Sequence, residues 1–324
     1  MVQFSLQEKR LRAKIFPVRP IPFRIPSVFA LIALALGSLH SAMAQDGGGA
    51  DATPPAVSTP GMKRQFEGLY ASWRDAMANQ DFAAWQQVTS QARQGEIRNQ
   101  IVSQRLSYPE AMFLSELGAP SVDALIHVDT LVRGDTASAV YFGKADFGIS
   151  EAAEVRDNFV VLRFVKEFGV WKYDNLRVIK FGDDPEVLLK LRNRDNSFLE
   201  APEFQPALVP PPIPGLVGNP DYIAELWVTA VGYEAKVTIN AQHKSAIAND
   251  SGRELINGGL VKGSNRLTLE VKEIPVDAGT PRHLEIGIYG AEKAEDKAER
   301  FYHFRSTAGV QPENLVTTFS VPGS

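Results

Sequence analysis

The chain of 324 residues contains no cysteine. Disulfide bonds, thiolate nucleophiles, iron–sulfur clusters and zinc sites built on cysteine are therefore all excluded. The acylated cysteine of a bacterial lipoprotein is excluded as well. A stable fold must come from the hydrophobic cores of the chain alone.

Familiar catalytic and metal-binding patterns are also missing. Beyond residue 44 the chain has four histidines, and no two of them share the helical i, i+4 spacing of a metal site. These histidines are His127, His243, His283 and His303. A Gly-x-Ser-x-Gly nucleophile elbow and a Gly-rich phosphate loop are absent. We therefore predict no metal, no cofactor and no catalytic residue.

Only one long apolar run is present, and it lies near the N-terminus. Six basic residues and one acidic residue in residues 1–24 precede the apolar residues 28–39, which end in an Ala-x-Ala pattern at residues 42–44. A run of about a dozen residues is shorter than the roughly 20 that span a bilayer. It predicts a signal peptide over residues 1–44, cleaved before Gln45, with an uncleaved anchor as the alternative. The mature protein is then expected in the periplasm or outside the cell, with no membrane attachment.

Cleavage makes the protein more acidic. It removes six basic and one acidic residue from totals of 34 and 38, which leaves 28 and 37 and a net charge of −9. An acidic surface repels phosphate backbones, so nucleic acid is not expected as a partner.

The hydrophobic pattern of the mature chain changes twice. Residues 45–61 are rich in small residues, proline and threonine and predict a flexible linker. From Met62 apolar residues recur at helical spacing, and Asp81 is placed to cap a second helix. Beyond Pro120 the pattern alternates, which predicts an antiparallel sheet covered by the helices in an α+β domain over residues 62–199. The expected strands are 122–132, 136–147, 155–168 and 170–181, and a last short helix follows Asp184.

Part of this domain resembles a known superfamily. Residues 159–181 contain a Val-Val-Leu-Arg-Phe-Val strand, a turn at Gly169 and the sequence Trp171-Lys172-Tyr173. This segment is similar to the last hairpin of the nuclear transport factor 2-like, or SnoaL-like, superfamily. The earlier residues Tyr70, Trp73, Asp81, Phe82 and Trp85 are similar to its opening helices. The resemblance covers residues 62–182 and implies an α+β cone, in which helices pack on a curved antiparallel sheet.

A small-molecule pocket between the helices and the sheet is implied by the same resemblance. Tyr70, Trp73, Trp85 and Tyr141 are the candidate ligand-binding residues, and the alternative is that these aromatics form plain core. Superfamily enzymes use buried carboxylates, and here His127 and Asp129 are expected on one solvent-facing side of the first strand, with Tyr141 and Asp146 on the next. None of these positions matches a catalytic set of the superfamily.

A proline-rich segment divides the mature chain. Residues 200–220 contain seven prolines, including the run Pro210-Pro211-Pro212-Ile213-Pro214. Such runs favour the extended polyproline II helix. We interpret the segment as a semi-rigid linker, with a ligand for a proline-recognition domain as the alternative.

The remaining residues, 221–324, predict an all-β sandwich. Six strands are expected, at 222–231, 234–240, 266–271, 284–289, 300–306 and 315–321. The turn Lys262-Gly263-Ser264-Asn265 and the strand after it resemble jelly-roll modules attached to glycoside hydrolases. In the matching Val-x-x-Asn-Gly strand end, Ala241 replaces the glycine. An immunoglobulin-like sandwich is equally compatible with the pattern.

One aromatic residue of this region is a candidate for ligand binding. Trp227 alternates with Glu225 and Thr229, whereas the other side of its strand is uniformly apolar. An outward Trp227 could serve as a stacking surface for a sugar, together with Tyr289 and Tyr302. The alternative is that Trp227 belongs to the core.

These features favour an exported, non-catalytic binding protein that recognises another envelope protein or a carbohydrate. The alternative is an enzyme or carrier that uses a pocket in the N-terminal cone. A homodimer is also conceivable, in which an open sheet face buries Phe159, Val161 and Val165 against a second copy.

Overall fold

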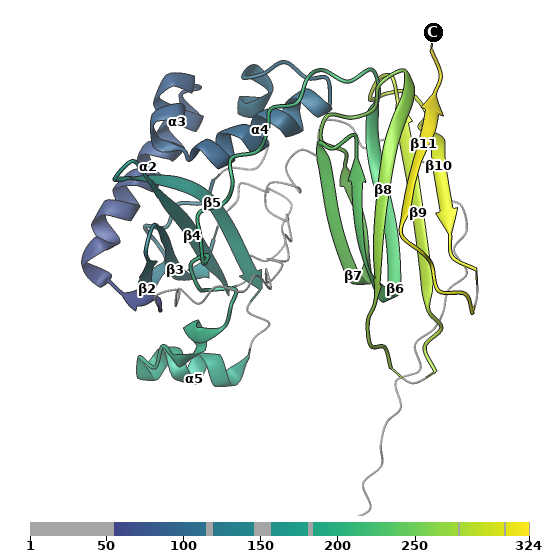
Figure 1. Ribbon diagram of the computed structural model, residues 1–324. Helices are drawn as coiled ribbons and strands as arrows, with labels where there is room; N and C mark the ends of the chain where they lie inside the picture. The colour runs from purple at the N-terminus through teal and green to yellow at the C-terminus, as the bar shows by residue number, and fades with distance from the viewer. Residues whose placement is uncertain are drawn as a thin grey trace, which may run out of the picture.

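The computed structural model of the chain describes residues 55–114, 119–145, 157–180, 184–277, 279–307 and 309–323. The predicted signal peptide, residues 45–54 of the predicted linker and the candidate residue Asp146 lie outside these ranges. The described residues form two antiparallel β-sheets with a few helices. Figure 1 shows the two sheets in separate parts of the molecule. We name these parts the N-terminal unit (residues 55–202) and the C-terminal unit (residues 221–323), and we name residues 203–220 the strap.

The N-terminal unit contains a five-stranded sheet in the order β1-β2-β3-β4-β5. Its strands are β1 (Val57–Ser58), β2 (Ile126–Arg133), β3 (Thr136–Lys144), β4 (Asp157–Glu167) and β5 (Val170–Lys180). Its helices are η1 (Pro60–Met62), α2 (Lys63–Ala78), α3 (Phe82–Val88), α4 (Gln91–Ser103), η2 (Glu110–Leu114), α5 (Pro185–Asn193) and η3 (Ser197–Glu200). The four strands predicted from alternation are confirmed, with ends that differ by a few residues.

Two local signals in the sequence position these elements. The Asp81 carboxylate accepts a hydrogen bond from the Ala84 N–H at 3.0 Å, so the predicted cap of the second helix is confirmed. Between β4 and β5, Phe168 and Gly169 have φ angles of 50° and 83°. Positive φ at both central residues is the geometry of a tight hairpin turn, which fixes the register of the two strands.

The predicted linker over residues 45–61 has a structured end. Val57 and Ser58 pair with Leu131 and Val132 as the edge strand β1. The Thr59 N–H donates to the Thr130 carbonyl at 2.6 Å. The prediction of flexibility was therefore wrong for these last residues, because an unpaired edge of β2 offers hydrogen bonds that composition does not reveal.

Both faces of the N-terminal sheet are covered by the chain itself. Phe66 and Tyr70 of α2 pack on one face against Leu162 and Phe164. The other face buries Val140, Phe142, Phe159 and Val161 under Phe198, Leu199 and Phe204. The centroids of the Phe159 and Phe204 rings lie 5.1 Å apart. A homodimer through Phe159 and Val161 would therefore require displacement of this covering segment.

A bulge in β2 separates two polar residues that the sequence pattern placed on one face. His127 lies opposite Tyr141 while Asp129 lies opposite Val140, so the register shifts at Val128. The extra residue turns His127 toward the α2 side, whereas Asp129 points to the other side and accepts a hydrogen bond from Ser58. The prediction of a shared solvent face was wrong, because strict alternation fails at a bulge.

The C-terminal unit contains a six-stranded sheet in the order β10-β9-β6-β8-β11, with β7 also paired to β6. Its strands are β6 (Ile223–Ile239), β7 (His243–Leu255), β8 (Gly263–Glu273), β9 (His283–Ala291), β10 (Glu299–Arg305) and β11 (Leu315–Val321). The sequence predicted two strands where the structure has the single long strand β6. It also missed β7, whose mostly exposed polar residues carry no apolar alternation.

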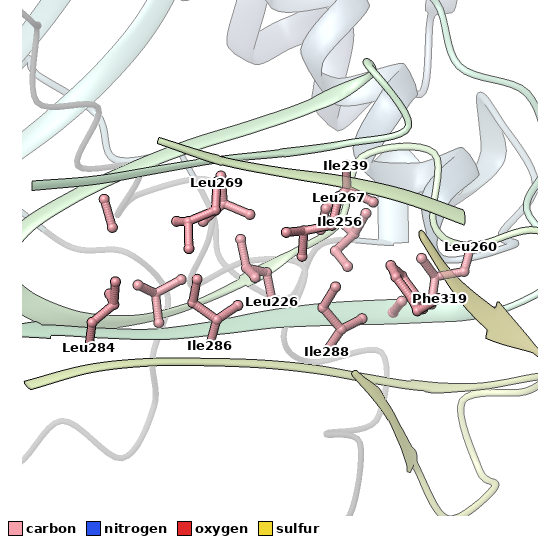
Figure 2. Packing of buried hydrophobic residues seen from close by; sticks show 14 of the residues in the cluster. Leu226, Ile239, Ile256, Leu260, Leu267, Leu269, Leu284, Ile286, Ile288 and Phe319 are labelled. Carbon is pink, nitrogen blue, oxygen red and sulfur yellow. The ribbon is translucent and has the colours of Figure 1, made fainter. Parts of the chain in front are cut away.

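Strand β6 bends, and the bend folds the sheet over on itself. Residues 223–231 pair with β9, residues 233–239 pair with β8, and the register with β7 shifts between Ala230 and Glu234. At the bend Gly232 has a φ of 79°, and its N–H donates to the Asn249 side chain at 2.7 Å. Figure 2 shows Leu226, Ile286 and Leu269 pointing into the space between the two halves. One core therefore serves both halves of the sheet.

The strap is anchored rather than loose. The Arg163 guanidinium donates to the carbonyls of Glu203 and Gln205 at 2.8 and 2.6 Å. Further along, the Asn99 amide of α4 donates to the Gly215 carbonyl at 2.9 Å and accepts from the Val217 N–H at 3.0 Å. Both ends of the strap are thus fixed to the N-terminal unit.

The same helix also contacts the C-terminal unit. The Ser103 hydroxyl at the end of α4 accepts a hydrogen bond from the Gly258 N–H at 2.8 Å. Just beyond the end of the helix, the Arg105 guanidinium donates to the carbonyls of Asp221 and Glu292 at 2.9 and 2.6 Å. Helix α4 therefore bridges the two units, beside the strap (Figure 1). Within the described ranges, no helix has the length and hydrophobicity needed to cross a bilayer.

Candidate functional site

Three of the predicted N-terminal aromatics lie on the α2 side of the sheet. Tyr70 and Tyr141 are almost completely buried in one core cluster, and Trp73 packs against its edge. The ring centroids of Trp73 and Tyr173 are 4.6 Å apart, and the Tyr70 hydroxyl donates to the Pro120 carbonyl at 2.9 Å. These side chains fill the space between the helix and the sheet.

The fourth predicted aromatic, Trp85, lies elsewhere. It is 0% exposed and packs with Ala76, Ile101 and Met112 beneath α2, α3 and α4. Its ring stacks on Phe82 with centroids 5.7 Å apart. Trp73 also packs against this cluster, whereas Tyr70 and Tyr141 belong to the neighbouring one, so the four aromatics are divided between two cores.

Three side chains with polar atoms, those of Glu67, Tyr141 and His127, lie together at the edge of the N-terminal core. The Tyr141 hydroxyl donates to Glu67 Oε1 at 3.3 Å, and the Tyr141 ring meets the His127 ring edge to face at 5.3 Å. Burial, followed by the Glu67 carboxylate, raises the pKa of Tyr141 well above its usual value. Burial, followed by the nearby Lys63 ammonium, lowers the pKa of His127. At neutral pH both groups are therefore uncharged.

Trp227 of the C-terminal unit has a different environment. Along β6, Leu226 and Val228 point into the core, while Glu225, Trp227 and Thr229 are only half-buried on the outer side. The alternation seen in the sequence therefore places the Trp227 side chain on the outer face of the sheet. Of the two alternatives for Trp227, a core residue and an outward one, this half-buried position on the outer side agrees with the second.

A second aromatic joins Trp227 across the sheet. Tyr289 on β9 pairs with Glu225, and Trp227 itself pairs with Gly287. The centroids of the Trp227 and Tyr289 rings are 5.1 Å apart, with 47° between the ring planes. We name these two residues the aromatic platform.

Gly287 lies beneath the Tyr289 ring. A Cβ atom built on Gly287 would lie 2.6 Å from Cε2 of Tyr289, closer than real contacts permit. Because Gly287 has no side chain, the Tyr289 ring can lie over the backbone of β9. The spacing in the sequence indicates that Gly287 and Tyr289 are neighbours on the same face of the strand, because they are two residues apart.

Charged groups surround the platform. Glu225 Oε2 accepts a hydrogen bond from the indole N–H of Trp227 at 3.2 Å, and Arg253 Nε lies 3.8 Å from the same oxygen. The Arg253 guanidinium sits 5.7 Å from the centroid of the Trp227 ring, in cation–π geometry. Arg253 was missed at the sequence level because its strand, β7, was not predicted.

A second carboxylate lies beside the platform on β9. Glu285 accepts hydrogen bonds from Nε2 of His303 at 2.9 Å and from Nε2 of His283 at 3.1 Å. The hydrogen bond from His303 is the main cause that lowers the pKa of Glu285. The outer face thus combines two aromatic rings with hydrogen-bonding groups of both signs.

Tyr302 does not belong to this face. It packs toward the core side, where its ring centroid lies 5.6 Å from that of Phe319. The register shift between Arg300 and Tyr302 redirects the side chains of β10. The suggestion that Tyr302 joins Trp227 was therefore wrong, and only Tyr289 does so.

The contacts of Glu285 with His283 and His303 do not amount to a metal site. In the part of the chain that the structure describes, no cluster of three or more His, Asp or Glu side chains has an arrangement able to hold a metal ion.

Comparisons of the chain with protein families, with curated proteins and with solved structures found no match.

Proposed function

We propose that the protein is an exported, non-catalytic binding protein whose C-terminal unit recognises carbohydrate through the aromatic platform. The observation that carries this proposal is the pair of rings, Trp227 and Tyr289, held 5.1 Å apart on an outer sheet face. The C–H face of a pyranose ring stacks on such aromatic surfaces, and Trp and Tyr combine an apolar face with a polar edge. Glu225, Arg253 and Glu285 stand where they can bind sugar hydroxyls.

The fold that we propose for this unit is a jelly-roll β-sandwich. A bent strand that serves two sheet halves over one core is a known way to build such sandwiches. The resemblance at residues 262–265 is supported by the role of Asn265, whose fully buried amide donates to the Val261 carbonyl at 2.7 Å and accepts from the Val261 N–H at 3.0 Å. Asn240 donates to the same Asn265 oxygen at 2.8 Å, which ties the turn to the end of β6.

For the N-terminal unit we propose the nuclear transport factor 2-like α+β cone, used as a scaffold. Helix α2 packs on one face of the antiparallel sheet, as that fold requires. The buried side chains of Tyr70, Tyr141 and Phe66 occupy the interior where relatives of this fold bind small molecules. Packing of this kind favours a scaffold over a ligand pocket.

The alternative function, a small-molecule site in the N-terminal unit, is favoured by one observation. Glu67, Tyr141 and His127 meet at the edge of the core, where uncharged Tyr and His side chains lie beside a carboxylate. Substitution Tyr141→Phe removes the hydroxyl and keeps the ring. Saturable binding of a small apolar dye that this substitution weakens would support the alternative over the scaffold.

A glycan-binding measurement tests the main proposal. The mature protein is applied to an array of bacterial and plant polysaccharides, and Kd is then measured by calorimetry for the glycans that bind. We expect Trp227→Ala with Tyr289→Ala to weaken binding by about tenfold or more, equivalent to about 1.4 kcal/mol.

Tyr302→Phe is the matched control for this experiment. It alters an aromatic residue of the same unit that faces the core side, so its Kd should equal that of the unmodified protein. Absence of binding to every polysaccharide, or equal loss of affinity in the control, would overturn the carbohydrate proposal.

Export to the periplasm or the cell exterior remains part of the proposal. The basic segment, the apolar run and the Ala-x-Ala pattern of residues 1–44 support it. Mass determination of the protein purified from the periplasm of an expressing bacterium tests it, with an N-terminus at Gln45 as the expected result.

A further inference from the structure

The middle of the strap exposes four large apolar side chains. Leu208, Val209, Ile213 and Leu216 are 64%, 68%, 61% and 65% exposed. Side chains of this size usually gain about 1.5–3 kcal/mol from burial, so a run of them in water is unfavourable. Several large apolar side chains that stay exposed along one ordered segment indicate a contact surface.

Anchors on both sides hold this exposed segment in place. Before it, the Thr136 hydroxyl donates to the Ala207 carbonyl at 2.6 Å. After it, Asn99 makes its two hydrogen bonds with Gly215 and Val217. A Cβ on Gly95 of α4 would lie 2.8 Å from Cγ of Pro214, so this glycine admits the proline ring against the helix. The segment is therefore ordered before any partner binds.

Burial along the strap repeats every third residue. Pro211 and Pro214 are half-buried and Val217 and Pro220 are buried, whereas the residues between them are exposed. Three residues per turn is the period of the polyproline II helix. One edge of this helix thus lies on the protein, and the edge formed by Pro210, Ile213 and Leu216 faces solvent.

The chemistry of this edge is apolar and uncharged. No charged residue occurs in residues 204–220, although the mature chain has a net charge of −9. The prolines lack N–H donors, so the polar groups that they offer are carbonyl acceptors. A partner must therefore supply apolar surface and hydrogen-bond donors rather than charge.

We propose that the Pro210–Ile213–Leu216 edge of the strap is a preformed polyproline II ligand for the aromatic-lined groove of a partner protein. Grooves of this type bind polyproline II segments through stacked Trp and Tyr rings whose polar edges donate to the carbonyls of the ligand. Anchoring at both ends lowers the entropy cost of binding, because the segment is already extended. This inference is independent of the carbohydrate proposal, which concerns the other unit.

Site-specific photo-crosslinking tests the proposal. The full chain is produced in its own cells with a photoreactive side chain in place of Ile213 or, as the matched control, of Val316. Both residues are 61% exposed and apolar, but Val316 lies on β11. We expect an adduct with one protein at position 213 alone, with the crosslink mapped to an aromatic groove.

Binding of the purified partner completes the test. Ile213→Ser with Leu216→Ser should raise Kd by about tenfold, as expected when interface anchors are lost, whereas Val316→Ser should leave it unchanged. An adduct with a second copy of this chain or with lipid, equal adducts at both positions, or no adduct at position 213 would each overturn the proposal. An unchanged Kd in the double variant would do the same.

Discussion

Trp85 of the N-terminal unit and Trp227 of the C-terminal unit are both flanked by aromatic neighbours, yet their environments are opposite. Trp85 is 0% exposed beneath three helices, whereas Trp227 is half-buried on an outer sheet face beside Glu225 and Arg253. A tryptophan inside contributes packing volume, and a tryptophan at a polar surface offers a ring to a ligand. Residue type alone therefore cannot identify a binding site, because burial and neighbouring groups decide what a tryptophan can do.

The largest expected effect is on stability. Trp85→Ala should lower the free energy of unfolding by about 3–5 kcal/mol, because it leaves a large cavity in a closed core. Trp227→Ala should lower it less, by about 1–2 kcal/mol, because its ring is only half-buried. Urea unfolding of both variants measures the difference, and equal losses would contradict the assignment of inside and outside.

Burial of a histidine should also make the stability of the protein depend on pH. His243 is buried, its Nδ1 accepts from the Asn257 N–H at 3.2 Å, and burial lowers its pKa to about 4. Below pH 6.5 the unfolded chain binds a proton that the folded protein resists until about pH 4. The free energy of unfolding should therefore fall as pH decreases from 6.5 to 4, by up to about 3 kcal/mol.

A variant separates this contribution from other acid effects. His243→Gln should reduce the slope of stability against pH in that window, relative to the unmodified protein. The Glu254 carboxylate, whose Oε1 lies 3.9 Å from Nε2 of His243, reduces the loss if it pairs with the protonated ring. An identical slope in the variant and the unmodified protein would refute a role for the burial of His243.

Two helical glycines test the contact between α4 and the strap. Gly68→Ala in α2 meets no atom within 4 Å and should stabilise the protein by about 0.5–1 kcal/mol, as usual for helices. Gly95→Ala meets the Pro214 ring and should instead destabilise it by about 1–3 kcal/mol. Hydrogen exchange at Val217 should quicken only in the second variant. A higher free energy of unfolding for Gly95→Ala would show that the strap does not pack tightly against the helix.

The smallest expected change in stability concerns Gly287. Gly287→Ala should change the free energy of unfolding by less than about 1 kcal/mol, because the Tyr289 ring can swing outward. Glycan affinity should nevertheless fall severalfold, since the platform loses its geometry. Calorimetric titration with the best glycan from the array measures it, and unchanged affinity would separate Tyr289 from the site.

Predictions from hydrophobic periodicity and helix caps were correct where they depend only on residues close together in the sequence. The Asp81 cap, the four N-terminal strands and the outward side of β6 all follow from residues within a few positions of each other. Errors occurred where the chain departs from strict alternation, at the bulge near Val128 and at the register shift before Tyr302. Strand β7 was missed because a polar strand is specified by its partner β6 rather than by its own sequence.

The sequence by itself determined the absence of cysteine chemistry, the change from helical to alternating pattern near Pro120 and the two sides of β6, because composition and period are local properties. Tertiary structure decided which aromatics are core and which form the platform. It also decided that the strap is pinned by Arg163 and Asn99 and that Gly287 lies under Tyr289. These outcomes depend on contacts between residues far apart in the chain, and no local pattern contains the distances that create them.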